Sequence, residues 1–229
     1  MNAQTFDFET HRERWRELPC EGDRDILTGE ALLQKTDEEI RSITAASIAN
    51  RYAPGAWRGG SRWPELLHAN VDGLVVMDFG CGLGVESLGL ARAGAKVVLA
   101  DINDASIMAA DHVLEVHGFD SYGIEHVTGE PPFFSYTSLL EQRLDVFYSN
   151  GVLHHTPLIT EILKRASECA DELRILVWSQ IMGSGDGEAY NEAWPYKKAK
   201  EHWSDFLTFE HHEPLGGGYF AVYFMRRKQ

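Results

Sequence analysis

Residues 75–84 read VVMDFGCGLG, and this stretch decides the fold. Its apolar first half is typical of a buried strand, and its second half alternates three glycines with other residues. Glycine lets the chain turn sharply and lets a ligand approach the backbone closely. A helix is predicted from about Val85 to Ala93, with Gly94 placed to end it. Since a helix start offers unpaired N–H groups and a partial positive charge, the turn could hold a phosphate or a carboxylate.

Asp101 follows a second apolar run, residues 97–100, about 20 residues after the glycine-rich turn. A carboxylate in that place can accept hydrogen bonds from both hydroxyls of a ribose. The dinucleotide fingerprint GxGxxG requires a glycine where Val85 or Ser87 stands, and no GK[ST] of a P-loop is present. The two segments together predict a site for a ribose-containing ligand, with a nicotinamide-dependent dehydrogenase as a less favoured alternative.

Further apolar runs predict five more strands, at residues 124–128, 145–149, 173–178, 206–210 and 219–225. Helical stretches at about 104–118 and 157–170 alternate with them, as in an α/β fold with a mostly parallel sheet. The last two strands are joined by residues 214–218, a link so short that the pair must be antiparallel. Residues 182–200 are expected to be irregular, and Gly183, Gly185 and Gly187 would allow that segment to move as a lid.

The first 70 residues are rich in charge and Trp and show no strong strand pattern. Helices are predicted at residues 6–18 and 37–52, the second opened by a capping box of Thr36 and Glu39. We expect residues 1–70 to form a helical lid or cap segment, and residues 71–229 to form the domain that binds the ligand.

The composition limits the classes of partner. A formal net charge of −14 argues against nucleic acid and anionic membranes, since proteins that bind phosphates carry basic stripes. The three cysteines, Cys20, Cys81 and Cys169, are odd in number and far apart, so neither a disulfide framework nor a zinc site is predicted. No secretory signal or apolar run of membrane-spanning length is seen, and a cytoplasmic location is expected.

The order of these segments resembles a known enzyme family. DFGCGLG followed by VVLAD is similar to motifs I and II of the class I S-adenosylmethionine-dependent methyltransferases. The later LDVFYSNGVLHHTP resembles the motif IV region of the small-molecule branch of that family. The resemblance covers roughly residues 71–229. It implies a Rossmann-like, doubly wound, seven-stranded sheet with an antiparallel C-terminal strand, and S-adenosyl-L-methionine as the cofactor.

The same resemblance implies a role for individual residues. The loop around the amino acid end of the cofactor would be formed by Gly80, Cys81, Gly82 and Gly84. Asp78 would orient the cofactor's ammonium, directly or through water, and Asn150 would lie beside the sulfonium through backbone contacts. Asp101 would bind the ribose hydroxyls and Ile102 would pack on the adenine. Glu130 would hydrogen-bond the adenine amino group, although the family more often has Asp there. Each residue also has a plainer interpretation, as a turn glycine, a helix cap or a surface acid.

Two adjacent histidines, His154 and His155, follow the fourth predicted strand and are the candidate general bases. An imidazole titrates near neutrality and can take a proton from a hydroxyl or an amine. The alternative is that one of them caps the next helix or packs in the core. No metal is expected, because no carboxylate sits at ligand spacing nearby. The aromatic residues that could line a substrate pocket, or simply pack in the core, are Trp15, Trp57, Trp63, Trp194 and Tyr196.

A small-molecule acceptor is the preferred substrate. The NPPY tetrapeptide of many amino-methylating enzymes is absent, since Asn150 is followed by Gly151-Val152-Leu153. The methylated atom stays open. Two other functions also remain open: a non-catalytic partner subunit that binds the cofactor, and a methyltransferase that acts on protein or RNA.

Overall fold

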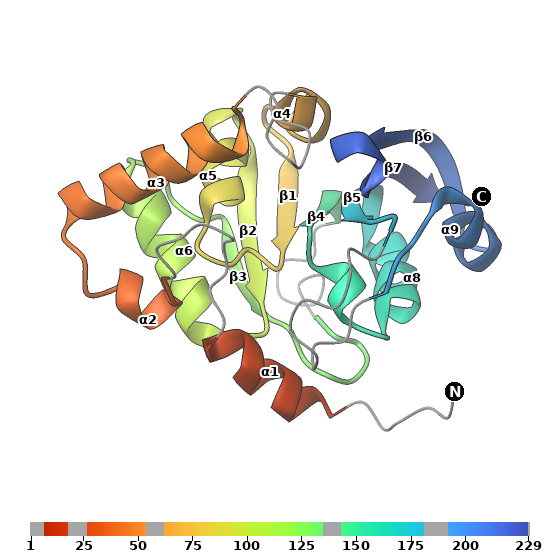
Figure 1. Cartoon of the computed structure of the whole chain (residues 1–229), viewed down its shortest axis with the longest axis horizontal. Helices are drawn as coiled ribbons and strands as arrows, with labels where there is room; N and C mark the ends of the chain where they lie inside the picture. Colours follow the sequence, from red (N-terminus) through yellow and green to blue (C-terminus); the bar gives the residue numbers. More distant parts are fainter. Residues whose placement is uncertain (1–6, 18–26, 54–61, 135–142, 181–191, 229) are drawn as a thin grey trace.

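The computed structural model describes residues 7–17, 27–53, 62–134, 143–180 and 192–228, and Figure 1 shows their arrangement. One seven-stranded sheet forms the centre, in the order β3-β2-β1-β4-β5-β7-β6. Its strands are β1 (Val75–Phe79), β2 (Lys96–Asp101), β3 (Gly123–His126), β4 (Leu144–Asn150), β5 (Ala170–Trp178), β6 (Leu207–Leu215) and β7 (Phe220–Arg227). The first five strands pair in parallel, and β7 is antiparallel to both of its neighbours. The predicted fold class is confirmed.

Helices cover both faces of the sheet, as Figure 1 shows. Described helices are α1 (Phe8–Glu17), α2 (Gly29–Leu32), α3 (Asp37–Arg51), α4 (Arg62–Leu67), α5 (Val85–Arg92), α6 (Asp104–Val116), α8 (Ile159–Cys169) and α9 (Tyr196–Trp203), with the 3-10 turns η1 (Leu153–His155) and η2 (Gly216–Gly218). In β1, Val75 and Met77 belong to the core cluster that contains buried residues of α8, whereas Val76 belongs to the cluster that contains those of α5 and α6. Because successive strand residues face opposite sides, burial of both faces requires the continuous apolar run seen in the sequence.

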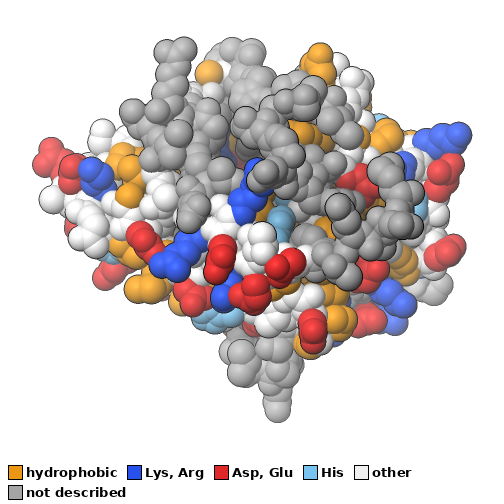
Figure 2. Space-filling model, turned by 60° about the horizontal axis from the view of Figure 1, so that its bottom comes forward, with side chains coloured by type: hydrophobic (Ala, Val, Ile, Leu, Met, Phe, Trp, Pro, Cys, Tyr) orange, Lys and Arg blue, Asp and Glu red, His pale blue; other side chains and the backbone are white. Residues whose placement is uncertain are grey.

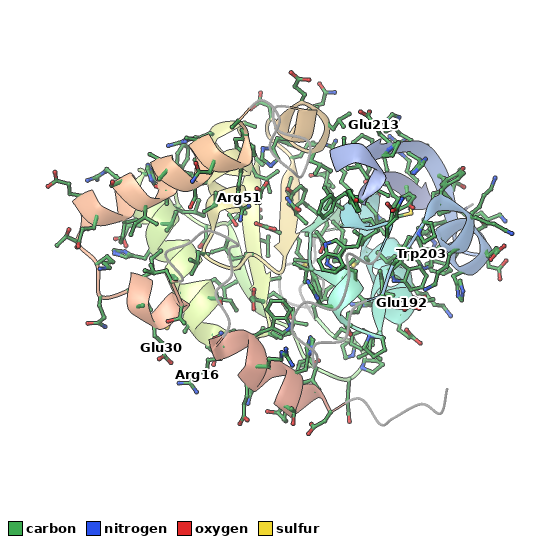
Figure 3. All side chains as sticks on the ribbon, in the orientation of Figure 1. Arg16, Glu30, Arg51, Glu192, Trp203 and Glu213 are labelled. Carbon is green, nitrogen blue, oxygen red and sulfur yellow. The ribbon has the colours of Figure 1, made fainter. Side chains whose placement is uncertain are left out.

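Helices α2 and α3 are attached to α6, on one side of the sheet. The predicted capping box opens α3: the Thr36 N–H donates to Glu39 Oε2 at 2.8 Å, and the Glu39 N–H donates to Thr36 Oγ1 at 3.3 Å. Arg41 then donates to the Val116 carbonyl at the end of α6. Helix α1 crosses the sheet at the carboxyl ends of the parallel strands (Figure 1). An exposed ion pair between Arg16 and Glu30 joins α1 to α2 (Figure 3).

Two expectations about local structure were wrong. Residues 196–200 are not irregular but begin α9, because Ala199 and Trp203 of this helix are buried against the sheet and Pro195 stands at its N-cap. The helix expected from Pro157 begins at Ile159, since the Thr156 hydroxyl accepts the Leu158 N–H and holds this stretch in a turn. Cys20, Trp57, Gly183, Gly185, Gly187 and the side chain of Trp63 lie outside the described residues. Within the described ranges, no helix has both the length and the apolar character needed to cross a bilayer.

Candidate active site

The β1–α5 turn has the tight geometry that its glycines predict. Gly80, Gly82 and Gly84 all have positive φ, at 81°, 52° and 78°. The N–H groups of Gly80 and Cys81 both donate to the Ala100 carbonyl, at 2.7 and 3.1 Å, which fastens the turn to the end of β2. Any other residue would be strained in such a conformation. At Gly80 a Cβ would also lie only 2.4 Å from the side chain of Val152, so the loop after β4 closes directly on this turn.

Gly84 serves a different purpose from the other two glycines. It is the N-cap residue of α5, and a Cβ there would lie 2.7 Å from Cα of Ala110 on α6. Gly84 does not line the cavity described below. Its position therefore matters for the close packing of α5 on α6.

A cavity opens at the carboxyl ends of β1, β2 and β4, beneath α1. Most of the residues predicted for the site line it, namely Asp78, Gly80, Cys81, Gly82, Asp101, Ile102, Asn150 and His155. Glu130 and His154 do not line it. Glu130 is exposed, and Thr128 lines the cavity near it. Figure 2 brings this end of the molecule forward and shows acidic and basic side chains side by side around it.

The two adjacent histidines have different surroundings. His154 is 1% exposed, and its ring stacks on Trp178 with 4.8 Å between centroids. His155 is partly exposed and lines the cavity. Its ring packs edge-on against Trp15 of α1, with 4.7 Å between the ring centroids. Of these two histidines, therefore, His155 lines the cavity and His154 does not.

Two carboxyl groups in the cavity wall have raised pKa values. Burial raises the pKa of Asp78 to about 7, although the Ser87 hydroxyl, which donates to Asp78 at 2.5 Å, favours its ionised form. Burial likewise raises the pKa of Asp101 to about 6. The N–H groups of Gly82 and Asn103 donate to its two oxygens at 3.1 and 3.0 Å, and these hydrogen bonds act in the opposite direction, because they favour the ionised form. Both groups are largely ionised at pH 8, where they present acceptors to a ligand.

Sequence reasoning missed several residues of this site. From α1, Phe8 and His11 line the cavity, next to the expected Trp15. Trp15 Nε1 donates to His11 Nε2 at 3.1 Å, and burial lowers the pKa of His11 to about 4, so His11 is neutral. Arg51 and Glu86 also line the cavity, and no local motif marked them. Trp194 and Tyr196 pack instead in an aromatic cluster with Trp203 and Tyr223.

The residues around the cavity suit an adenosyl group that carries an amino acid. Asp101 offers a carboxylate for ribose hydroxyls, and Ile102, Val127 and Phe133 offer an apolar surface for a purine. Oδ1 of Asn150 is buried and has no hydrogen-bond partner within the described part of the chain, as is typical of an atom that awaits a ligand. No group of three or more metal-ligating side chains occurs among the described residues.

Comparisons with known proteins agree with this fit. A family model described as a methyltransferase domain matches residues 70–210. The cypemycin N-terminal methyltransferase of a Streptomyces species is 42% identical over 60 residues, which are 26% of this chain and only 23% of that relative's length.

Two solved structures are similar in fold. The magnesium protoporphyrin IX methyltransferase of Synechocystis PCC 6803, with bound SAH, is 19% identical, with a TM-score of 0.57 over 96% of this chain and 95% of that one. A ribosomal protein L11 methylase from Lactobacillus delbrueckii subsp. bulgaricus is 15% identical, with a TM-score of 0.54 over 74% of this chain and 79% of that one.

The family match covers more than half of the chain and includes the glycine-rich turn, Asp101 and both histidines. The chain therefore belongs to the methyltransferase-domain family, the class I methyltransferases that depend on S-adenosylmethionine.

Proposed function

We propose that this chain transfers the methyl group of S-adenosylmethionine to a small-molecule acceptor bound beneath α1. The observation that carries the proposal is the shared cavity: Asp101 and the glycine-rich turn form one wall, and Trp15 with His155 forms another. Two relatives named above point the same way, since one is named for magnesium protoporphyrin IX and the other for the N-terminus of cypemycin. The L11 methylase keeps a protein acceptor as the alternative.

In this proposal the protein residues bind and align the reactants. Asp101 accepts the ribose hydroxyls, Ile102 packs on the adenine, and the turn from Asp78 to Gly82 holds the amino acid end of the cofactor. Thr128, which lines the cavity whereas Glu130 does not, takes the place next to the adenine amino group. The bound cofactor supplies a methyl group already activated by its sulfonium. Alignment of an acceptor and exclusion of water then contribute most of the rate enhancement.

Thermal unfolding with added ligands tests the cofactor. S-adenosylmethionine or S-adenosylhomocysteine at about 100 times its dissociation constant should stabilise the protein by about 2.7 kcal/mol. For a chain of this length the midpoint should rise by roughly 5–11 °C. NADH at the same concentration should give no shift. A shift with NADH alone would refute the proposal in favour of hydride chemistry. A second measurement, release of S-adenosylhomocysteine in the presence of an acceptor, distinguishes an enzyme from a non-catalytic binding subunit.

His155 is the proposed general base for an acceptor that must lose a proton. His155→Gln should lower kcat by about 100-fold, the lower end of what a positioned base contributes. The affinity of the His155→Gln variant for S-adenosylhomocysteine should stay within a factor of about two of that of the unaltered protein. His126→Gln is the control, because His126 is 62% exposed and lies outside the cavity lining. An unchanged kcat in His155→Gln would show that the acceptor needs no base from this residue.

A further inference from the structure

Glu86 is the centre of a buried hydrogen-bond network beside the cofactor cavity. It belongs to the first turn of α5, and its side chain is only 8% exposed. Its Oε1 accepts from Arg51 Nη1 at 2.6 Å, and its Oε2 accepts from the Tyr148 hydroxyl at 2.8 Å. His68 Nε2 lies 3.0 Å from the same Oε2. The network thus joins four parts of the chain: helix α3, helix α5, strand β4 and the residue that follows α4.

The charge of Glu86 fixes the direction of these hydrogen bonds. Burial opposes ionisation, but the hydrogen bond from His68 and the charges of Arg51 and His68 outweigh it and hold the pKa of Glu86 well below its usual value. An ionised carboxylate only accepts, so the Tyr148 hydroxyl must give it the one proton that it has. The Tyr148 oxygen can then only accept from Asn150, 3.0 Å away.

This chain of donors decides which way the Asn150 amide points. Its Nδ2 is held toward Tyr148, so its Oδ1 is the atom left without a partner among the described residues. A buried carbonyl oxygen in a cavity wall calls for a hydrogen-bond donor on the ligand. An ammonium group is such a donor.

Arg51 supplies a positive charge and hydrogen-bond donors to the same cavity. It is the only Arg or Lys among the described residues that line the cavity, whose wall also holds three acids: Asp78, Glu86 and Asp101. Figure 3 places Arg51 between α3 and the sheet. A guanidinium has five N–H donors, so it can pair with Glu86 and still bind a second carboxylate. Arg51 lies before the matched domain, which begins at residue 70.

We propose that Arg51 and Asn150 hold the zwitterionic amino acid end of the cofactor, Arg51 at its carboxylate and Asn150 Oδ1 at its ammonium, and that Glu86 is the positioning residue for both. This inference rests on the proposed cofactor function. It gives the N-terminal segment a direct part in cofactor recognition, in addition to covering the cavity.

Binding calorimetry with three adenosyl ligands tests the proposal. S-adenosylhomocysteine has the whole amino acid end, decarboxylated S-adenosylmethionine has only its ammonium, and 5′-methylthioadenosine has neither group. Arg51→Gln should weaken S-adenosylhomocysteine binding by about 10-fold or more, and leave the other two ligands within about twofold. Tyr148→Phe should weaken the two ligands with an ammonium by several-fold, because the Asn150 amide is then free to flip, and spare 5′-methylthioadenosine. Glu86→Gln should lower the affinity for S-adenosylhomocysteine relative to 5′-methylthioadenosine.

The matched control is Arg41→Gln, on the same helix α3 but bonded to the Val116 carbonyl outside the cavity. It should bind all three ligands like the unaltered protein. Arg51→Lys keeps the charge if Arg51→Gln fails to fold, and should still lose affinity for S-adenosylhomocysteine selectively, because it lacks the planar fork.

An equal loss of affinity for S-adenosylhomocysteine and 5′-methylthioadenosine in the Arg51 variants would overturn the proposal, because the network would then only shape the cavity. Failure of the unaltered protein to bind S-adenosylhomocysteine would instead overturn the cofactor function together with the proposal.

Discussion

Asp101→Ala should weaken S-adenosylhomocysteine binding by about 10- to 100-fold, since the loss of its charge-assisted hydrogen bonds to the ribose should cost about 1.5–3 kcal/mol in total. The carboxylate also accepts the N–H groups of Gly82 and Asn103, so its loss releases the turn that we propose to hold the cofactor. Isothermal titration calorimetry at pH 8 measures the change. Asp104→Ala is the matched control, three residues further along, because that side chain is 74% exposed and pairs only with His126 in the described contacts.

The pH dependence of the affinity gives a second readout for Asp101. With a pKa of about 6, this carboxyl must lose its proton to accept from the ribose, so affinity should rise from pH 5 to pH 7 and protons should be released on binding. Asp101→Asn should remove this part of the rise, and its single amide oxygen can still accept only one of the two N–H groups of Gly82 and Asn103. Any increase in the affinity of this variant that remains above pH 7 would come from ionisation of Asp78, whose pKa is about 7. Equal affinity for Asp101→Ala and the unaltered protein would place the cofactor elsewhere.

The contribution of Asp78 and Asp101 to the stability of the free protein should fall with rising pH, whereas the affinity for the cofactor rises. The unfolded chain releases the protons of Asp78 and Asp101 near the ordinary value of 3.8, whereas the folded protein keeps them up to about pH 7 and 6. On these two carboxyls the folded state therefore binds more protons between these limits, and their contribution to the free energy of unfolding falls as pH rises from about 4 to about 7. His11 contributes with the other sign, because its pKa is lowered from 6.5 to about 4 in the folded protein. Bound cofactor should reduce this loss.

Gly84→Ala should have the largest effect on stability, about 2–4 kcal/mol. The residue has a φ of 78°, and its new Cβ would lie 2.7 Å from the main chain of Ala110, which cannot move aside as a side chain could. Helices α5 and α6 would have to separate at the point where the glycine-rich turn ends and α5 begins. The unfolding midpoint should fall by about 5–15 °C in a thermal scan.

Gly118→Ala separates the two causes of that loss. Gly118 has nearly the same φ, 82°, but nothing lies within 4 Å of the position where its Cβ would stand. Gly118→Ala should therefore lose only about 1 kcal/mol of stability, the cost of placing a Cβ on a residue with positive φ. If both variants lost the same amount, the close approach of α5 and α6 would contribute nothing to stability.

The local sequence determined the centre of this protein. An apolar run, three alternating glycines and a terminal acid specify backbone conformation within a few residues, and β1, its turn, α5 and β2 form where the pattern predicts them. The capping box of α3 and the antiparallel C-terminal strands were also predicted, because they depend on neighbours in the chain. Helix α9 was missed, since it is stabilised by burial of Trp203 against Phe209 and Tyr223 of the sheet more than by its own pattern.

Only the tertiary structure decided which side chains meet in the cavity. Arg51 reaches Glu86 from 35 positions away, and Trp15 reaches His155 from α1, contacts that no spacing in the sequence encodes. The clearest case is His154 and His155, two identical side chains in one 3-10 turn. The sequence identified the pair, but the direction of that turn placed His154 on Trp178 and His155 in the cavity, because adjacent residues on a helical turn point to different sides.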